Sequence, residues 1–345
     1  MPQEIIRKLA AGQHLTREEA TAAVSALMDG QATPAQIGAL LMALRLKGET
    51  VEEIAGFAQG MRARVVPVRP RRAPLLDTCG TGGSTFRVFN VSTASAFVAA
   101  AAGIAVAKHG NRAMTSVCGS ADVLEALGVR IGLTPEECAA CIDEVGIGFL
   151  FAPAHHPAMK QVSGPRREIG VRTIFNLLGP LTNPAGATLQ AMGVYDPALC
   201  PLAAGALRDL GSARAIVVHG EVGMCEIATI GPTYVSELRD GQVTSYTLTP
   251  HDLGLEGPEP CPEDLAPAPT PEANAELVRE VLAGKAESGP TLARRNLVAV
   301  NAAAALRVSG LAESWPEAVR LAQSILASGR ALAVVDRLAA FTTHS

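Results

Sequence analysis

The spacing of apolar residues changes near residue 70, and this change constrains the fold more than any other feature of the sequence. Before it, the apolar residues recur at helical spacing. After it, short apolar runs at 74–78 and 104–108 alternate with helical patterns at 92–102 and 120–127. Strands that alternate with helices of about 10 to 15 residues form a mostly parallel sheet with helices on both faces. The sequence therefore predicts an α/β protein with such a central sheet.

The first 65 residues predict a small all-helical domain. Capping boxes at 16–19 and 50–53 each precede a helical apolar run, and Thr33-Pro34 starts another helix. We predict a helical domain over 1–70 and a larger α/β domain over 71–345. The apolar faces of the helical domain can serve either a core or a dimer contact.

The second half of the chain continues the alternation of strands and helices. A capping box at 134–137 opens a helix, and a hairpin is predicted to turn at Asp240-Gly241. The stretch 252–276 is rich in proline and acidic residues and predicts an exposed excursion. We expect two long helices at the end of the chain.

Composition and charge exclude several classes of protein. With 48% apolar and 18% charged residues the chain is not disordered, and a net charge of −4 gives no bulk attraction to nucleic acid. We interpret 62–72, which mixes Arg with Val and Pro, as an interdomain linker rather than a nucleic-acid contact. The start of the chain lacks the apolar region of a signal peptide, and the longest apolar run, 96–107, is too short to span a membrane.

The seven cysteines favour reduced thiols over a disulfide framework. Cys138 and Cys141 form a C-x-x-C pair on a predicted helix, without a second pair at zinc-binding spacing. We interpret both as small buried helix residues. With no secretory signal and no membrane contact predicted, we expect the protein to be cytoplasmic.

A glycine-rich segment, DTCGTGGS at 77–84, follows a predicted strand and leads to NVSTA at the start of a helix. Glycines allow the backbone to approach a ligand, and a helix N-terminus adds positive potential, so the segment predicts an anion site that suits phosphate. It is neither a dinucleotide-binding nor a Walker motif. By itself the glycine cluster is equally compatible with a plain tight turn, and Ser92 with a simple helix cap.

The next predicted strand ends in KHGNR at 108–112, and Ser116, Gly119, Ser120 and Asp122 follow at another helix start. Lys108 and Arg112 place positive charge at the carboxyl end of a strand, where open parallel sheets bind ligands. Two such loops within about 45 residues exceed the needs of one phosphate. We therefore expect a ligand with separated phosphates.

These motifs carry a resemblance to a known family. GTGG, NVSTA, KHGNR, GSADVLEALG, HHPAMK, RREIGVRTIFNLLGPLTNPAG and the amino-terminal TPAQIGALLMALRLKGET resemble the anthranilate phosphoribosyltransferases of tryptophan biosynthesis. The resemblance runs from about residue 15 to the last helices. It implies a helical domain, rejoined by roughly 165–185, a larger α/β domain, a homodimer and magnesium-dependent use of phosphoribosyl pyrophosphate with anthranilate.

The resemblance also implies roles for individual residues. Phosphoribosyl pyrophosphate is expected to contact Gly80, Gly83, Ser84, Val88, Asn90, Val91, Ser92, Thr93, Lys108, Ser116 and Ser120. Anthranilate is expected to contact Gly80, Asn111, His156 and Arg166, and magnesium to be held by Ser92 and Glu226. Lys108 and Glu226 are the expected catalytic residues. The fork of Arg166 suits a planar carboxylate, which agrees with its expected role, although a plain surface arginine fits the sequence as well.

The implied reaction is displacement of pyrophosphate at the anomeric carbon by a neutral aromatic amine. Such an amine needs no strong general base, because its nitrogen is already unprotonated at neutral pH and its lone pair is free to attack. Catalysis is expected from positioning and from stabilisation of the leaving group by magnesium, Lys108 and backbone N–H groups.

The chain departs from the family pattern where metal and phosphate are expected. The family usually has Asp at the position of Ser84, Gly at Thr85, Thr at Val88 and Ser at Cys118. Cys225 stands in place of the Asp of an Asp-Glu metal pair whose Glu is Glu226. A thiol is a poor ligand for magnesium, so this metal position is in question. Glu221 is a possible substitute, and a single ion held by Ser92 and Glu226 is another solution.

Two alternatives remain open at this stage. One is a related phosphoribosyltransferase with a different aromatic acceptor. The other is a non-catalytic homologue with an impaired metal site. A pyrimidine nucleoside phosphorylase, which has a similar fold, would require a Lys-x-Ser phosphate motif, and we do not find one.

Overall fold

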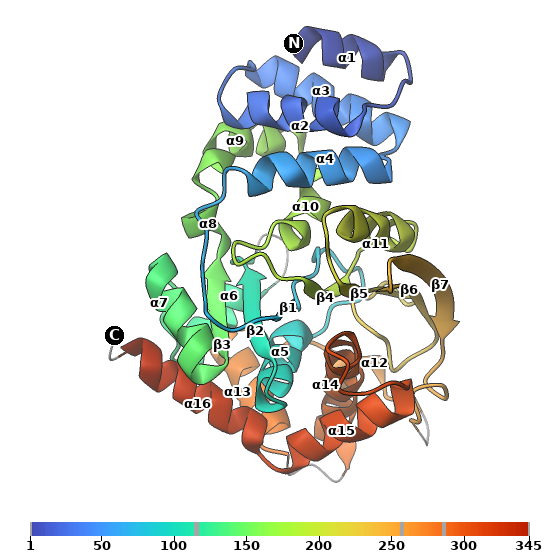
Figure 1. Cartoon of the computed structure of the whole chain (residues 1–345). Helices are drawn as coiled ribbons and strands as arrows, with labels where there is room; N and C mark the ends of the chain where they lie inside the picture. The colour runs from blue at the N-terminus through green and yellow to red at the C-terminus, as the bar shows by residue number, and fades with distance from the viewer. Residues whose placement is uncertain (1, 114–116, 256–258, 285–287, 344–345) are drawn as a thin grey trace.

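The helical domain is present in the computed structural model, which describes residues 2–113, 117–255, 259–284 and 288–343. Its helices are α1 (Pro2–Ala10), α2 (Arg17–Met28), α3 (Pro34–Lys47) and α4 (Val51–Arg62), which lie at the top of Figure 1. Thr16, Thr33 and Thr50 each accept a hydrogen bond from the backbone N–H three residues later, which closes a capping box. These caps, with Pro34 in the first turn of α3, are the reason the helices begin where the sequence predicts.

The described residues also form one seven-stranded sheet with the order β3-β2-β1-β4-β5-β6-β7. Its strands are β1 (Leu75–Asp77), β2 (Ala105–Gly110), β3 (Ile147–Phe151), β4 (Leu189–Gly193), β5 (Arg214–Gly220), β6 (Thr233–Arg239) and β7 (Gln242–Leu248). The first five are parallel, and β6 and β7 form the antiparallel hairpin expected around Asp240-Gly241. The predicted fold class is confirmed.

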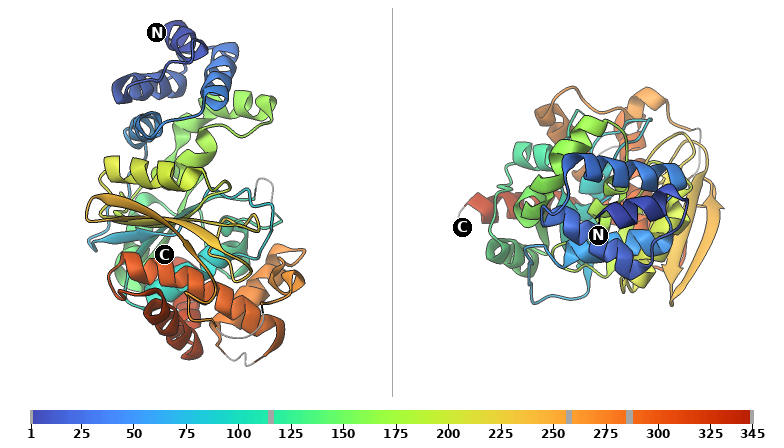
Figure 2. Two further views of the ribbon diagram at one scale, coloured as in Figure 1. Left: turned by 90° about the vertical axis from the view of Figure 1, so that its right-hand side faces the viewer. Right: turned by 90° about the horizontal axis from the view of Figure 1, so that it is seen from above.

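Helices cover both faces of the sheet. Helices α5 (Val91–Ala101), α14 (Gly289–Val308), α15 (Trp315–Ala327) and α16 (Arg330–Thr343) lie below it in Figures 1 and 2, and α10 (Phe175–Leu181) and α11 (Leu199–Asp209) lie above. Successive side chains of strand β5 point alternately to the two helix layers. Ile216 and Val218 join the core with α5 and α14, whereas Ala215 and Val217 join the core with α11 and α4. The second core is continuous with the helical domain.

The connection after β3 leads the chain back to the helical domain. It contains α8 (Ala152–His155), a short 3₁₀ turn (Pro157–Met159), α9 (Lys160–Ile169) and α10. Helix α9 packs against α2 and α3, and α10 packs against α4. The contact with the helical domain thus starts before residue 165, because α9 begins at Lys160. Residues 62–72 run from α4 toward β1, and Arg62 donates to the carbonyl oxygens of Leu181 and Leu210.

The carboxyl-terminal region has more helices than expected. Besides α14, α15 and α16 it contains α12 (Pro262–Leu265) and α13 (Pro271–Leu282), both starting inside the stretch interpreted as an excursion. The missed signal is Thr270, whose hydroxyl accepts from the backbone N–H of Ala273 while Pro271 occupies the first turn. The remaining helices are α6 (Ser120–Ala126) and α7 (Pro135–Ala140), and the π-helical turn Cys141–Val145 extends α7.

All seven cysteines are free, as expected, and Cys138 and Cys141 are buried around the end of α7. The thiol of Cys138 donates to the carbonyl of Phe149 at 3.5 Å, so this pair is part of the core. In the described part of the chain no single helix is long and apolar enough to cross a membrane, although α15 and α16 meet that criterion when counted together as a bent pair.

Candidate active site

The candidate site lies at the carboxyl ends of the parallel strands. The glycine loop (residues 80–85) follows β1, the β2–α6 loop (111–119) follows β2, and the β5–β6 connection (221–232) follows β5. Because neighbouring parallel strands end at the same edge of a sheet, the three segments come together although up to 150 residues separate them in sequence. This is the edge at which the sequence predicts the phosphate-binding loops.

A buried carboxylate fixes the ends of β1 and β2 relative to each other. One oxygen of Asp77 accepts from the backbone N–H groups of Cys79 (2.9 Å) and His109 (3.1 Å), and the other accepts from the Nδ2 of Asn183 (2.8 Å). Burial raises the pKa of Asp77 to about 6. Ligand atoms of Asp77, Cys79 and His109 lie within 4.8 Å of one another, but this carboxylate already serves three donors. We therefore assign it a structural role.

Lys108 and Ser92 meet beneath the glycine loop. The Lys108 ammonium donates to Thr78 Oγ1 at 3.2 Å and to Ser92 Oγ at 3.5 Å, and the residue is only 2% exposed. Burial lowers the pKa of Lys108, and within the described residues its hydrogen-bond partners are two uncharged hydroxyls. A buried ammonium without a hydrogen-bonded carboxylate is prepared to bind an anion.

The glycine loop requires its glycines. Gly82 and Gly83 have φ values of 62° and 84°, in the region that side chains disfavour, and the Thr81 N–H donates to the Gly193 carbonyl at 2.9 Å. The Arg172 guanidinium donates to the Gly83 carbonyl at 2.7 Å. Val91 is part of the hydrophobic core, and the half-buried Val88 packs against that core.

The start of α5 is bonded to the β2–α6 loop. The Asn90 amide donates to the carbonyl oxygens of Cys118 (3.2 Å) and Gly119 (3.3 Å), and Ser120 Oγ donates to the Asn111 carbonyl at 3.2 Å. Among the described residues, the Oδ1 of Asn90 and the Oγ1 of Thr93 are buried without a protein partner. These orphaned polar atoms indicate a polar ligand. Ser116, also expected here, lies outside the described residues.

Glu226 is the acidic group of the β5–β6 connection that fits a cation. Its Oε2 is buried and has no hydrogen-bond partner in the part of the chain that the structure describes, and burial raises the pKa of the carboxyl to about 7. The side-chain amide of Asn301 on α14 clamps the adjacent Ile227, accepting from its N–H at 2.8 Å and donating to its carbonyl at 3.0 Å. An unpaired carboxylate oxygen on a fixed backbone is compatible with magnesium, which prefers hard oxygen ligands.

The other two candidate ligands of the connection are engaged elsewhere. The Cys225 thiol donates to the Gly82 carbonyl at 3.3 Å, and burial raises the pKa of this thiol to about 12. Glu221 is exposed and accepts from the hydroxyl of Tyr234 at 3.2 Å. The geometry therefore favours the single-carboxylate arrangement over a substitute ligand from Glu221.

The residues expected to contact the acceptor come from the α8–α10 segment, from the β2–α6 loop and, in the case of Gly80, from the glycine loop. Arg166 on α9 lies over the Phe175 ring with 5.0 Å between its Cζ and the ring centroid, and burial lowers its pKa. His156 is buried with both ring nitrogens unpaired, 5.1 Å from the ring of His109, and burial lowers its pKa to about 4. The Oδ1 of Asn111 accepts from the Arg112 N–H at 2.8 Å.

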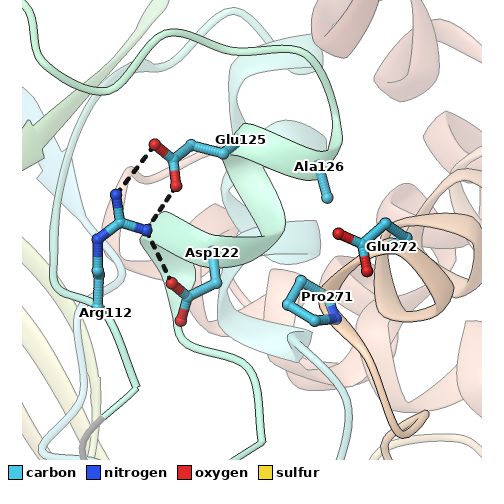
Figure 3. A pocket seen from close by; sticks show the side chains of 6 residues that line it. All are labelled: Arg112, Asp122, Glu125, Ala126, Pro271 and Glu272. Carbon is cyan, nitrogen blue, oxygen red and sulfur yellow. Dashed lines mark hydrogen bonds and ion pairs between the residues drawn. The ribbon is translucent and has the colours of Figure 1, made fainter.

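Arg112 is tied to carboxylates rather than left free for a phosphate. Its guanidinium donates to Asp122 at 3.0 Å and to both oxygens of Glu125, as Figure 3 shows. This group lines a cavity of about 300 Å³ that reaches Pro271 and Glu272 on α13. The positive charge expected from both Lys108 and Arg112 is therefore supplied here by Lys108.

Sequence reasoning missed four residues that hold the site in shape: Thr78, Asn183, Arg172 and Asn301. Asn183 and Arg172 lie inside the recognised RREIGVRTIFNLLGPLTNPAG segment, which was a usable signal. Asn301 lies in an Ala-rich helix, where its polar side chain was the one hint of a role. None of the four contacts follows from spacing, because each joins residues far apart in the chain.

Comparison with known proteins agrees with this geometry. Residues 3–65 match the helical bundle domain of a glycosyl transferase family, and residues 72–332 match the α/β domain of such a family. The anthranilate phosphoribosyltransferase of Symbiobacterium thermophilum is 53% identical over 338 residues, which cover 98% of this chain and 97% of the relative.

Two solved structures are similar over nearly the whole chain. The anthranilate phosphoribosyltransferase of Thermus thermophilus has a TM-score of 0.90 and 46% identity, covering 98% of this chain and 99% of the other. The Saccharomyces cerevisiae enzyme, in complex with PRPP and Mg, has a TM-score of 0.88 and 28% identity, covering 100% and 98%. This chain therefore belongs to the anthranilate phosphoribosyltransferase family of glycosyl transferases.

Proposed function

We propose that this protein transfers the phosphoribosyl group of 5-phosphoribosyl 1-pyrophosphate to the amine of anthranilate and releases pyrophosphate, a step of tryptophan biosynthesis. The family assignment over nearly the full length supports the reaction. The observation that best supports this reaction at the described site is the buried Lys108 ammonium beside Ser92, next to a glycine loop at the strand ends. A buried cation beside a glycine-rich loop and a helix start suits a phosphate or pyrophosphate group.

The residues of the glycine loop and the β2–α6 loop are proposed to bind the sugar phosphate. Gly80, Gly83 and the start of α5 offer backbone N–H groups, while Asn90, Thr93 and Ser120 offer side-chain polar atoms. Lys108 stabilises the negative charge that grows on the leaving pyrophosphate. One such electrostatic contact typically lowers the barrier by about 3 kcal/mol.

The enzyme uses magnesium, and Ser92 and Glu226 are the residues proposed to hold it. The orphaned Oε2 of Glu226 supports this assignment. The bound ion supplies positive charge to the pyrophosphate oxygens during departure.

The acceptor side is proposed to orient anthranilate rather than to activate it. Arg166 binds the planar carboxylate with its fork of N–H donors, and Asn111 and the neutral His156 complete the contact. The aromatic amine is neutral at pH 7 and attacks the anomeric carbon as the pyrophosphate leaves. Its proton can pass to water after attack, so the site needs no strong base.

Beyond the reaction itself, we propose the division into a helical domain (1–70, rejoined by roughly 165–185) and an α/β domain (71–345). We also propose a homodimer formed through the helical domain, because the family resemblance implies one. Seven free cysteines support a reducing, cytoplasmic location.

The experiment that tests the proposed function follows the fluorescence change as anthranilate is converted, with magnesium varied. Turnover that depends on magnesium is expected, and no turnover at any magnesium concentration would refute the function. Arg166→Ala should raise the KM for anthranilate by roughly 10- to 100-fold, because a charge-assisted contact is worth about 1.5–3 kcal/mol. An equal rise in the KM for the sugar phosphate would show that Arg166 does not belong to the acceptor pocket.

A further inference from the structure

The glycine loop and the β5–β6 connection are joined directly by uncharged groups. The backbone N–H of Cys225 donates to Ser84 Oγ at 3.0 Å, and the Cys225 thiol donates to the Gly82 carbonyl at 3.3 Å. The two side chains thus form reciprocal contacts between loops that are 141 residues apart. We call this pair of contacts the Ser84–Cys225 clasp.

Backbone contacts on both sides of the clasp support the same closure. The N–H groups of Thr85 and Phe86 both donate to the Gly223 carbonyl, at 3.0 and 3.1 Å. At Gly193 a Cβ would overlap the carbonyl oxygen of Cys225, so β4 approaches the connection at backbone distance. The glycine loop is therefore held against the connection by hydrogen bonds between protein groups.

The clasp uses up the groups that could otherwise help to bind a second cation. Ser84 Oγ already accepts a hydrogen bond, and a thiol is a poor ligand for magnesium. The oxygens of Asp77 serve three N–H donors, and Glu221 is exposed and bonded to Tyr234. Within the described ranges, Glu226 alone offers this region a buried carboxylate oxygen without a partner.

We propose that the Ser84–Cys225 clasp closes the glycine loop without a metal ion, and that the site accordingly takes one divalent cation per chain, on Ser92, Glu226 and the pyrophosphate of the bound substrate. This inference rests on the proposed function, since the pyrophosphate supplies the other hard oxygen ligands. Magnesium sites built from one or two carboxylates and substrate phosphates are common.

The clasp has a consequence for variants with acidic residues. Aspartates at positions 84 and 225 would bring two negative charges to the interface between the loops, next to Glu226. Without a cation these charges repel, so the loop would close only when a metal ion bridges them. The neutral clasp of this chain removes that dependence.

Counting bound Mn²⁺ in the full-length protein tests the inference. Electron paramagnetic resonance of free Mn²⁺, titrated at saturating phosphoribosyl pyrophosphate without anthranilate, should give one bound ion per chain. Two bound ions per chain would overturn the inference. A wild-type protein that does not bind phosphoribosyl pyrophosphate at all would instead refute the proposed function, so the two failures are distinguishable.

Thermal unfolding without substrate gives the second measurement. Millimolar Mn²⁺ should leave the Tm of the wild type unchanged and raise the Tm of the Ser84→Asp/Cys225→Asp variant by roughly 2–4 °C, since ligand binding to the folded state stabilises it. Equal Mn²⁺ responses of the two proteins would contradict the clasp.

Should the double variant not fold, Cys225→Ser, which keeps a hydrogen-bond donor, and Cys225→Ala replace it. The former should retain the wild-type KM for phosphoribosyl pyrophosphate and the latter should raise it about fivefold, and equal values for the two would speak against the clasp.

Discussion

The two halves of the site are built in different ways. The donor side, made of the glycine loop and the β2–α6 loop, follows directly after strands and is held by backbone hydrogen bonds and by Asp77, Asn90 and Lys108. The acceptor side, made of α8–α10, leaves the sheet, packs on α2 and α3 and presents Arg166 and His156 from its own short helices.

The difference shows how two chemical tasks are divided. Binding a pyrophosphate needs many N–H groups and a cation, which strand ends and helix starts provide with little help from side chains. Binding a small aromatic acid needs a few side chains at fixed orientation, which requires packing from two domains. The predictions below test this division, starting with the largest expected effect.

The strongest test of the donor side is Lys108→Met. Loss of the buried ammonium should lower kcat/KM by about 100- to 1000-fold, because it removes charge stabilisation of the leaving pyrophosphate. The fluorescence assay measures this loss, and thermal unfolding checks that the variant is folded. A fall of less than about tenfold with an unchanged Tm would show that the donor side does not depend on Lys108.

The acceptor side is tested by the dependence of the unfolding free energy on pH. The pKa of His156 is about 4 in the folded state and near 6.5 in an unfolded chain, so the unfolded state binds more protons between these values. Stability is therefore fully present above pH 6.5 and falls as the pH drops toward 4. Between pH 7 and 4.5, protonation of His156 should lower the unfolding free energy of the wild type by about 2–3 kcal/mol. The His156→Phe variant should lack this part of the decrease.

Urea denaturation at the two pH values measures this difference. His251→Gln, which replaces an exposed histidine, supplies the matched control for the effect of losing a histidine at the surface. His109, whose pKa burial lowers to about 3, keeps part of the acid sensitivity in both variants. Identical pH dependence of His156→Phe and the wild type would mean that the imidazole is not buried as described.

The smallest effect is expected at the contact between the two sides. Arg172 follows α9, donates to Gly83 and lies over the Tyr195 ring with its Cζ 4.3 Å from the centroid. Arg172→Ala should raise the KM for phosphoribosyl pyrophosphate about fivefold and leave the KM for anthranilate unchanged, because about 1 kcal/mol of loop positioning is lost.

The exposed Arg167 on α9 is the control, and Arg167→Ala should alter neither KM. Tyr195→Leu should reproduce the rise of Arg172→Ala, and the double variant should add nothing to it. Additive effects would separate the two residues and leave Arg172 without a role in holding the loop.

Sequence reasoning predicted the elements and the loop edge better than the side-chain contacts of the site. Caps such as Thr16 and Thr50 and the strand-ending position of GTGG are local signals, so the elements and the loop edge were predictable. Thr270 shows the limit of this approach, because its cap lies in a stretch whose proline and acidic content predicted no helix. The unpaired nitrogens of His156 and the pairing of Arg112 with Glu125 depend on neighbours that no spacing reveals.

The sequence by itself determined the two-part architecture, the order of strands and helices in the first half of the chain, and the glycine loop with a lysine at the end of the next strand. These properties follow from hydrophobic period, capping and backbone conformation, which act over a few residues. Only the tertiary structure decided that Cys225 donates to Gly82, that Asn301 holds Ile227 and that Glu226 keeps an unpaired oxygen. Long-range contacts of this kind arise when strand order brings distant loops to one edge, and local sequence does not encode which side chains then meet.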